Sequence, residues 1–90
     1  MLNELFEIIE ERKANPTEKS YTASLFAEGE YRVLQKVGEE AVEVIIAAKG
    51  QGDQRIIEEI SDLFYHTLVL LSAKDLTLSD VEDELRKRHK

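Results

Sequence analysis

The sequence contains no cysteine, a single proline and only four glycines among its 90 residues. The lack of cysteine excludes disulfide bonds and thiolate metal sites. So few prolines and glycines argue against a β fold with many tight turns. No apolar run approaches the roughly 20 residues that a membrane-spanning helix needs, and the N-terminal segment lacks the apolar core of a signal peptide. We therefore expect a cytoplasmic protein with no membrane partner.

Positive charge is also scarce. Lys and Arg number 12 against 19 Asp and Glu, which gives a formal net charge of −7. This balance disfavours sequence-independent binding to nucleic acid, but it does not exclude a phosphate-bearing ligand held through a metal cation. Because 42% of so short a chain is hydrophobic, we expect two copies to share one core in a homodimer.

Hydrophobic residues recur at helical spacing along most of the chain, and no segment alternates like a strand between hairpin turns. The pattern predicts an all-α fold, in a single domain over residues 1–90. Its centre is an antiparallel hairpin of two long helices, flanked by shorter helices and dimerising into a larger helical bundle. The predicted helices cover about residues 2–14, 21–28, 30–49, 53–73 and 80–88.

Capping residues are predicted at several helix ends. Ser20 precedes the short helix 21–28 and Gly29 follows it. Asp53 is the expected N-cap of the second long helix. Ser79 and Glu82 have the spacing of a capping box, which predicts the start of the last helix.

Each long helix carries one acidic stripe beside a wide apolar face. Between positions 37 and 48 of the first long helix, every polar side chain is a carboxylate: Glu39, Glu40 and Glu43. Because the rest of this stretch is apolar, we expect the helix to be buried in a bundle or dimer. Gly38, inside the same stretch, is best explained by a close approach of another helix. The second long helix carries Glu59 and Asp62, and antiparallel packing allows the two stripes to face each other.

Carboxylates gathered in this way repel one another by about 1–4 kcal/mol per pair unless a cation lies between them. Such an oxygen-rich site without thiolates suits Mg²⁺, or else Mn²⁺. Alternatively, the acids form a solvated surface of a non-enzymatic helical interaction module. Lys36 either pairs with Glu40 one turn later or contacts a phosphate. His66 is more often a hydrogen-bonded histidine than a ligand at such a position.

The motif Glu39-Glu40-x-x-Glu43 is followed, after fifteen residues, by Glu59-x-x-Asp62. With its setting in segments 20–29, 36–49 and 58–71, it resembles the phosphoribosyl-ATP pyrophosphohydrolase family of MazG-like all-α nucleotide pyrophosphohydrolases. The resemblance covers nearly the whole chain. It implies the stand-alone form of the enzyme, without a fused cyclohydrolase domain.

The resemblance implies hydrolysis of 1-(5-phospho-β-D-ribosyl)-ATP between its α- and β-phosphates. The products are the corresponding AMP derivative and pyrophosphate, in the second step of L-histidine biosynthesis. It also implies a homodimer and the metal ligands Glu40, Glu43, Glu59 and Asp62. Glu39 is then a further ligand or the general base, so that the catalytic carboxylates are Glu39, Glu40 and Glu43.

Substrate phosphates need donors outside the carboxylate group. Lys36 and Arg55 are the expected cations at the edge of the acidic stripes. Ser20, Tyr21 and Thr22 offer hydroxyls at a helix N-terminus, although Ser20 can equally serve as a simple N-cap. A second enzymatic interpretation keeps the metal site but makes the chain a house-cleaning hydrolase of nucleoside triphosphates.

Overall fold

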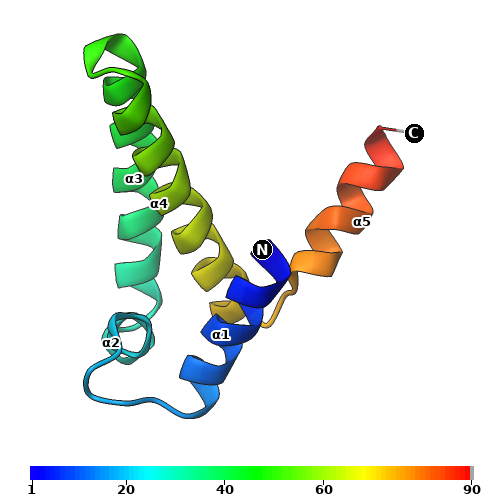
Figure 1. The fold of residues 1–90 in the computed structure, drawn as a ribbon. Helices are drawn as coiled ribbons and strands as arrows, with labels where there is room; N and C mark the ends of the chain where they lie inside the picture. The colour runs from blue at the N-terminus through cyan, green and yellow to red at the C-terminus, as the bar shows by residue number, and fades with distance from the viewer. Residues whose placement is uncertain (90) are drawn as a thin grey trace.

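The computed structural model describes residues 1–89, and within them it contains five α-helices and no strand. The prediction of an all-α fold is confirmed (Figure 1). The predicted bounds of the first and second helices and the predicted end of the fourth are also confirmed. The third helix extends one residue further than predicted, and the last begins two residues earlier. The helices are α1 (Leu2–Ala14), α2 (Tyr21–Glu28), α3 (Glu30–Gly50), α4 (Asp53–Ala73) and α5 (Leu78–Arg88).

The two long helices α3 and α4 pack side by side as the predicted antiparallel hairpin (Figure 1). The turn between them contains Gly52, whose φ is 91°. Glycine occupies this backbone region without the steric cost that other residues incur. At the opposite end of the hairpin, α2 packs against α3 and α1 packs against α4.

The hydrophobic core lies at the end of the hairpin where α1 and α2 meet it. Every helix contributes to this cluster: Ile9, Leu25, Val33, Leu68, Val69 and Leu78 are all buried. The half of the hairpin nearer the turn has no such cover, and its apolar side chains Val42, Ile45, Ile46 and Ile57 are exposed. The expected burial of the first long helix is therefore not achieved within one chain.

The explanation proposed for Gly38 is wrong within this chain. A Cβ atom placed on Gly38 would meet no atom within 4 Å, so no neighbouring helix of the described residues approaches it closely. The glycine lies on an exposed part of α3.

Two of the predicted caps are wrong by one or two residues. The N-cap of α4 is Gly52, and Asp53 is instead the first helical residue. There its negative charge interacts favourably with the positive end of the helix dipole. The capping box of α5 is formed by Thr77 and Asp80 rather than by Ser79 and Glu82. The segments 77–80 and 79–82 both have the spacing that a capping box requires. The earlier start places Leu78 in the first turn of α5, where it is buried in the core, and this burial favours the Thr77 box.

Replacing Thr77 by alanine should destabilise α5 by about 1 kcal/mol, because the Asp80 backbone N–H then loses its acceptor at 3.2 Å. The matched control is Ser79→Ala, which removes a hydroxyl that caps nothing in this structure. Amide hydrogen exchange should show α5 opening about fivefold more often in the Thr77 variant only. Equal effects of the two substitutions would contradict the assignment of the cap.

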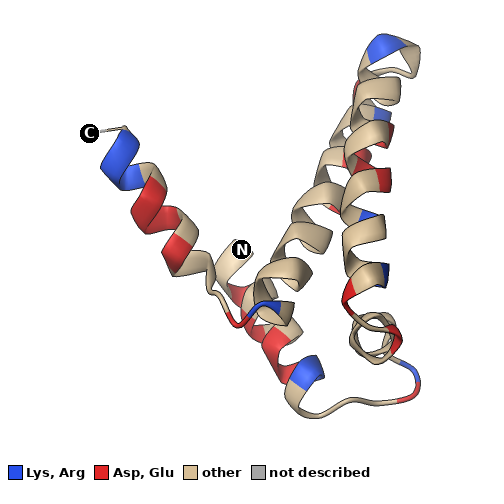
Figure 2. Cartoon of the chain, turned by 180° about the vertical axis from the view of Figure 1, so that it is seen from behind, with Lys and Arg blue, Asp and Glu red and all other residues tan. Residues whose placement is uncertain are grey.

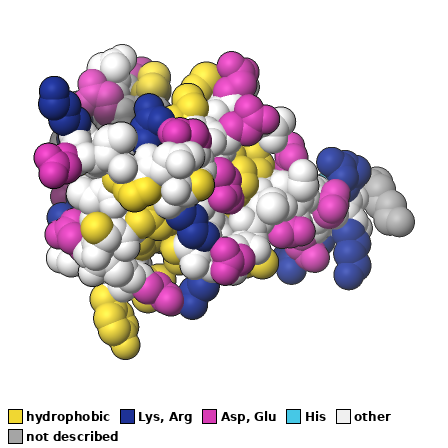
Figure 3. Space-filling model, turned by 90° about the horizontal axis from the view of Figure 1, so that it is seen from below, with side chains coloured by type: hydrophobic (Ala, Val, Ile, Leu, Met, Phe, Trp, Pro, Cys, Tyr) yellow, Lys and Arg dark blue, Asp and Glu magenta, His cyan; other side chains and the backbone are white. Residues whose placement is uncertain are grey.

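The last helix, α5, projects from the rest of the chain as an arm that carries charges of both signs (Figure 3). Two apolar side chains of this arm, Val81 and Leu85, line a shallow groove of about 280 Å³ together with Leu71 and Leu76. None of the helices described for residues 1–89 has the length and apolar character needed to cross a lipid bilayer.

Candidate functional site

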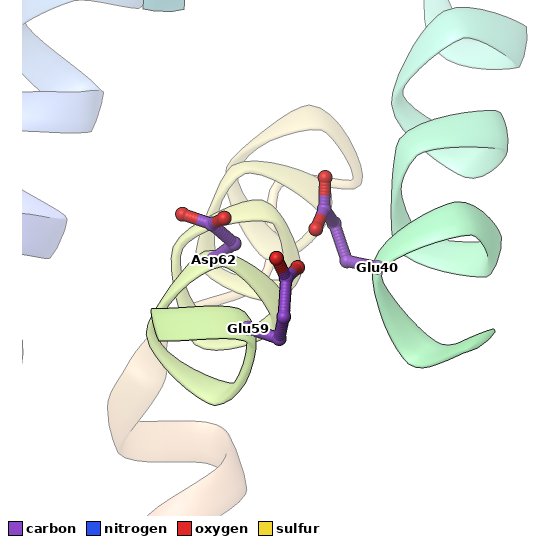
Figure 4. A group of neighbouring side chains, drawn as sticks. All are labelled: Glu40, Glu59 and Asp62. Atoms are coloured by element: carbon purple, nitrogen blue, oxygen red, sulfur yellow. The ribbon is translucent and has the colours of Figure 1, made fainter. Parts of the chain in front are cut away.

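Three carboxylates converge between the two long helices. Glu40 reaches from α3 toward Glu59 and Asp62 on α4 (Figure 4). One carboxylate oxygen of each residue lies within 4.8 Å of the other two. Glu59 and Asp62 share one face of α4 because they are three residues apart. The prediction that the acidic stripes face each other is confirmed for these three residues, which we call the carboxylate triad.

The triad combines burial with concentrated negative charge. Glu40 is 8% exposed and Glu59 is 6% exposed, whereas Asp62 is open to solvent. Figure 2 shows acidic residues of both long helices gathered partway along the hairpin. At separations near 5 Å, each pair of carboxylates repels by about 1–3 kcal/mol. Buried carboxylates at such distances need positive partners.

Each buried carboxylate has one cation on its own helix, one turn before it. The Lys36 Nζ atom lies 3.3 Å from Glu40 and 3.6 Å from Glu39. Arg55 pairs in the same way with Glu59 and also with Glu58. These contacts confirm the ion pair between Lys36 and Glu40. The two cations nevertheless face more carboxylates than they can neutralise, so the site remains negative.

The surroundings of Lys36 stabilise its charged form. Partial burial acts to lower the pKa of Lys36, but the hydrogen bond to Glu40 and the negative charges of its surroundings, those of Glu40 and Glu39 among them, outweigh it and raise the pKa above its usual value. On the other helix, hydrogen bonds from Arg55 and then Gln54 lower the pKa of Glu58. Lys36 is therefore a fixed positive charge at the edge of the triad.

The other two predicted acids lie outside the triad. Glu39 is exposed, and its carboxylate accepts a hydrogen bond of 3.1 Å from Gln35 along the outside of α3. Glu43 is half-buried and is not a member of the group of three. The positions of these two side chains do not test their predicted roles as metal ligand or general base.

The three hydroxyl residues predicted to contact phosphate have different surroundings. Ser20 caps the helix by accepting a hydrogen bond of 3.1 Å from the Ala23 backbone N–H, as predicted. Thr22 is buried and its hydroxyl bonds to that of Tyr65 on α4. Tyr21 is 49% exposed, which leaves it the most accessible of the three to a ligand.

His66 was expected to be a hydrogen-bonded histidine, and this prediction is confirmed. Its Nδ1 atom lies 2.8 Å from the backbone oxygen of Asp62, and its Nε2 atom lies 3.0 Å from the Tyr21 hydroxyl. The contact with Tyr21 was not predicted, since it joins residues 45 positions apart. Only the spacing of His66 and Asp62, one helical turn, was visible in the sequence.

The donor set of the triad fits a hard divalent cation. All three donors are carboxylate oxygens, which Mg²⁺ and Mn²⁺ prefer, and no cysteine is present in the sequence to favour a softer metal. The exposed Asp62 leaves one side of the triad open toward solvent. A polyanionic ligand can therefore approach the site from that side.

Comparison with known proteins agrees with this chemistry. Residues 2–89 match the family described as phosphoribosyl-ATP pyrophosphohydrolase. A phosphoribosyl-ATP pyrophosphatase of Geotalea daltonii is 53% identical, over 98% of this chain and 83% of that protein. The phosphoribosyl-ATP pyrophosphatase of Clostridium acetobutylicum is 52% identical, over 99% of this chain and 81% of that protein.

A third relative is a longer protein. The histidine biosynthesis bifunctional protein HisIE of Caldanaerobacter subterraneus subsp. tengcongensis is 51% identical over the whole of this chain, which spans 44% of that protein. The family match covers every helix of the fold and all three triad residues. This chain is therefore a member of the phosphoribosyl-ATP pyrophosphohydrolase family, a family of hydrolases.

Proposed function

We propose that this chain hydrolyses 1-(5-phospho-β-D-ribosyl)-ATP to 1-(5-phospho-β-D-ribosyl)-AMP and pyrophosphate, the second step of L-histidine biosynthesis. The observation that carries the proposal is the convergence of Glu40, Glu59 and Asp62 in a chain that matches the family over residues 2–89. We place the reaction in the cytoplasm and assign it to residues 1–90 acting as one domain.

Glu40, Glu59 and Asp62 would hold Mg²⁺, or Mn²⁺ in its place. A divalent ion bound there supplies charge neutralisation for phosphate oxygens and lowers the pKa of water. We assign Glu43 as a fourth ligand because it follows Glu40 by one turn of α3 and is half-buried. Glu39, exposed on the same helix, is the candidate for the general base that takes a proton from the attacking water.

The chain's own cations would bind the phosphates of the substrate. Lys36 and Arg55 lie beside the triad and are already held there by Glu40 and Glu59. Positioned cations are what phosphoryl chemistry requires, because its barrier is lowered mainly by placement and charge stabilisation. Tyr21, between Ser20 and Thr22 at the start of α2, is linked to the triad through His66, which contacts both the Tyr21 hydroxyl and the Asp62 backbone oxygen.

The active unit is proposed to be a homodimer. One chain leaves five large apolar side chains uncovered on the hairpin (Val42, Ile45, Ile46, Ile57 and Phe64), each between 44% and 63% exposed. The radius of gyration is 14.1 Å, whereas a compact domain of this length would have about 12 Å. A second copy packed on the hairpin would cover this surface and extend the small core.

A direct comparison of substrates tests the proposed function. With Mg²⁺ present, kcat/KM for pyrophosphate release from phosphoribosyl-ATP should exceed that for free ATP, dCTP and dUTP by at least about a hundredfold. Chelation with EDTA should abolish release, and added Mg²⁺ should restore it. A preference for the free triphosphates would favour the house-cleaning hydrolase instead. No hydrolysis at all and no effect of Mg²⁺ on thermal stability would favour the non-enzymatic module.

A further inference from the structure

His66 has both ring nitrogens in defined hydrogen bonds, although it lies outside the triad. It is 5% exposed and sits one turn after Asp62 on α4. The Nδ1 atom is 2.8 Å from the Asp62 backbone oxygen, and the Nε2 atom is 3.0 Å from the Tyr21 hydroxyl. A buried imidazole with two specific partners has a fixed orientation.

The partners also determine where the protons lie in the neutral ring. A backbone carbonyl oxygen only accepts hydrogen bonds, so the Nδ1 atom of His66 must carry the proton that it donates to Asp62. The Nε2 atom of the neutral ring then has a lone pair and accepts. It follows that the Tyr21 hydroxyl donates its proton to His66, and the Tyr21 oxygen keeps its own lone pairs for another partner.

Tyr21 is held in place on several sides while part of it stays accessible. Its ring stacks on Tyr65 at 6.2 Å and meets His66 edge-on at 5.9 Å. The next residue, Thr22, ties α2 to the hydroxyl of Tyr65. Tyr21 nevertheless remains 49% exposed.

We propose that His66 is a positioning residue that acts through Tyr21. By accepting a hydrogen bond from the Tyr21 hydroxyl, it fixes the phenol oxygen as a hydrogen-bond acceptor for a hydroxyl group of the nucleotide substrate, and its own contact with the Asp62 backbone links that oxygen to the triad. The proposal rests on the proposed function for its substrate. It revises the expectation for Tyr21, because an oxygen whose proton is already donated to His66 does not donate that proton to a phosphate.

A double-mutant cycle tests this coupling. Tyr21→Phe keeps the ring and removes the hydroxyl, while His66→Leu removes both ring nitrogens at similar volume. Each should raise KM for phosphoribosyl-ATP by about three- to tenfold, the range expected for one lost hydrogen bond, with kcat changed less than twofold. The double variant should raise KM no more than the larger of the two single substitutions does, because both changes remove the same contact.

Two further variants separate positioning from folding. His66→Gln retains an acceptor near the Nε2 position, so its increase in KM should be at most half of the increase seen for His66→Leu. His89→Gln, at the exposed end of α5, should behave like the unaltered protein. The proposal would be overturned if the increases in KM caused by Tyr21→Phe and His66→Leu multiplied in the double variant. It would also be overturned if His66→Gln raised KM as much as His66→Leu does.

Nitrogen-15 NMR of the imidazole rings provides a readout that needs no activity. In mildly alkaline solution, His66 should carry its proton on Nδ1, and Tyr21→Phe should shift the Nε2 resonance. A proton on Nε2 would overturn the proposal even if the enzyme is active. If the chain bound Mg²⁺ but did not hydrolyse phosphoribosyl-ATP, the proposed function would fail, and the NMR result would still decide whether His66 holds Tyr21.

Discussion

Glu59→Gln is expected to lower kcat/KM for phosphoribosyl-ATP by about a thousandfold, with the fold retained. The substitution preserves volume but removes the charge of one buried triad carboxylate, and a loss of about 4 kcal/mol of charge stabilisation corresponds to this factor. Mg²⁺ should also lose its effect on thermal stability. In the unaltered protein, Mg²⁺ at 100 times its dissociation constant should add about 2.7 kcal/mol to the free energy of unfolding.

The neighbouring Glu58 offers a matched control. Glu58 also pairs with Arg55, but it is exposed and lies outside the triad. Glu58→Gln should therefore keep activity and the Mg²⁺ effect within about twofold, since surface ion pairs contribute little. Pyrophosphate release and thermal melts with and without Mg²⁺ measure both variants. A Glu59 variant that hydrolyses as well as the Glu58 variant would refute the triad as the metal site.

Ile45→Lys is expected to convert the protein from dimer to monomer. Ile45 is 63% exposed in the single chain, the largest exposed fraction among the uncovered apolar side chains of the hairpin. If a second copy covers these side chains, a lysine at position 45 must lose its hydration without gaining a partner, at a cost of about 3 kcal/mol. That cost raises the dimer dissociation constant by more than about a hundredfold. Sedimentation velocity across a concentration series measures it.

The control for this substitution is Ile8→Lys, which places the same charge on α1, where Ile8 is 49% exposed. It should leave the sedimentation profile unchanged. A monomeric unaltered protein, or a dimer that tolerates lysine at position 45, would show that the hairpin face is not the interface. Because the small core lies at one end of the hairpin, the monomeric variant should also melt at a lower temperature.

The sequence predicted the helices well because their signals are local. Spacing of apolar residues and the positions of Gly29, Gly52 and the single proline are sufficient to place the helices to within about two residues. The predicted cap of α5, Ser79 with Glu82, was wrong because Thr77 with Asp80 has the same spacing and forms the box instead. Burial of Leu78 favours the Thr77 box, and that contact with distant helices is not visible locally.

The same division applies to the candidate site. The sequence by itself determined the all-α fold, one acidic stripe on each long helix and the residue types that a hard cation requires, because helical periodicity fixes which side chains share a face. Only the tertiary structure decided that Glu40 joins Glu59 and Asp62 while Glu39 stays outside. Neighbours on a helix point about 100° apart, so the rotation of α3 in its packing against α4 decides which of the two faces that helix. The tertiary structure also brought Tyr21 to His66, because contacts between distant segments depend on how helices pack.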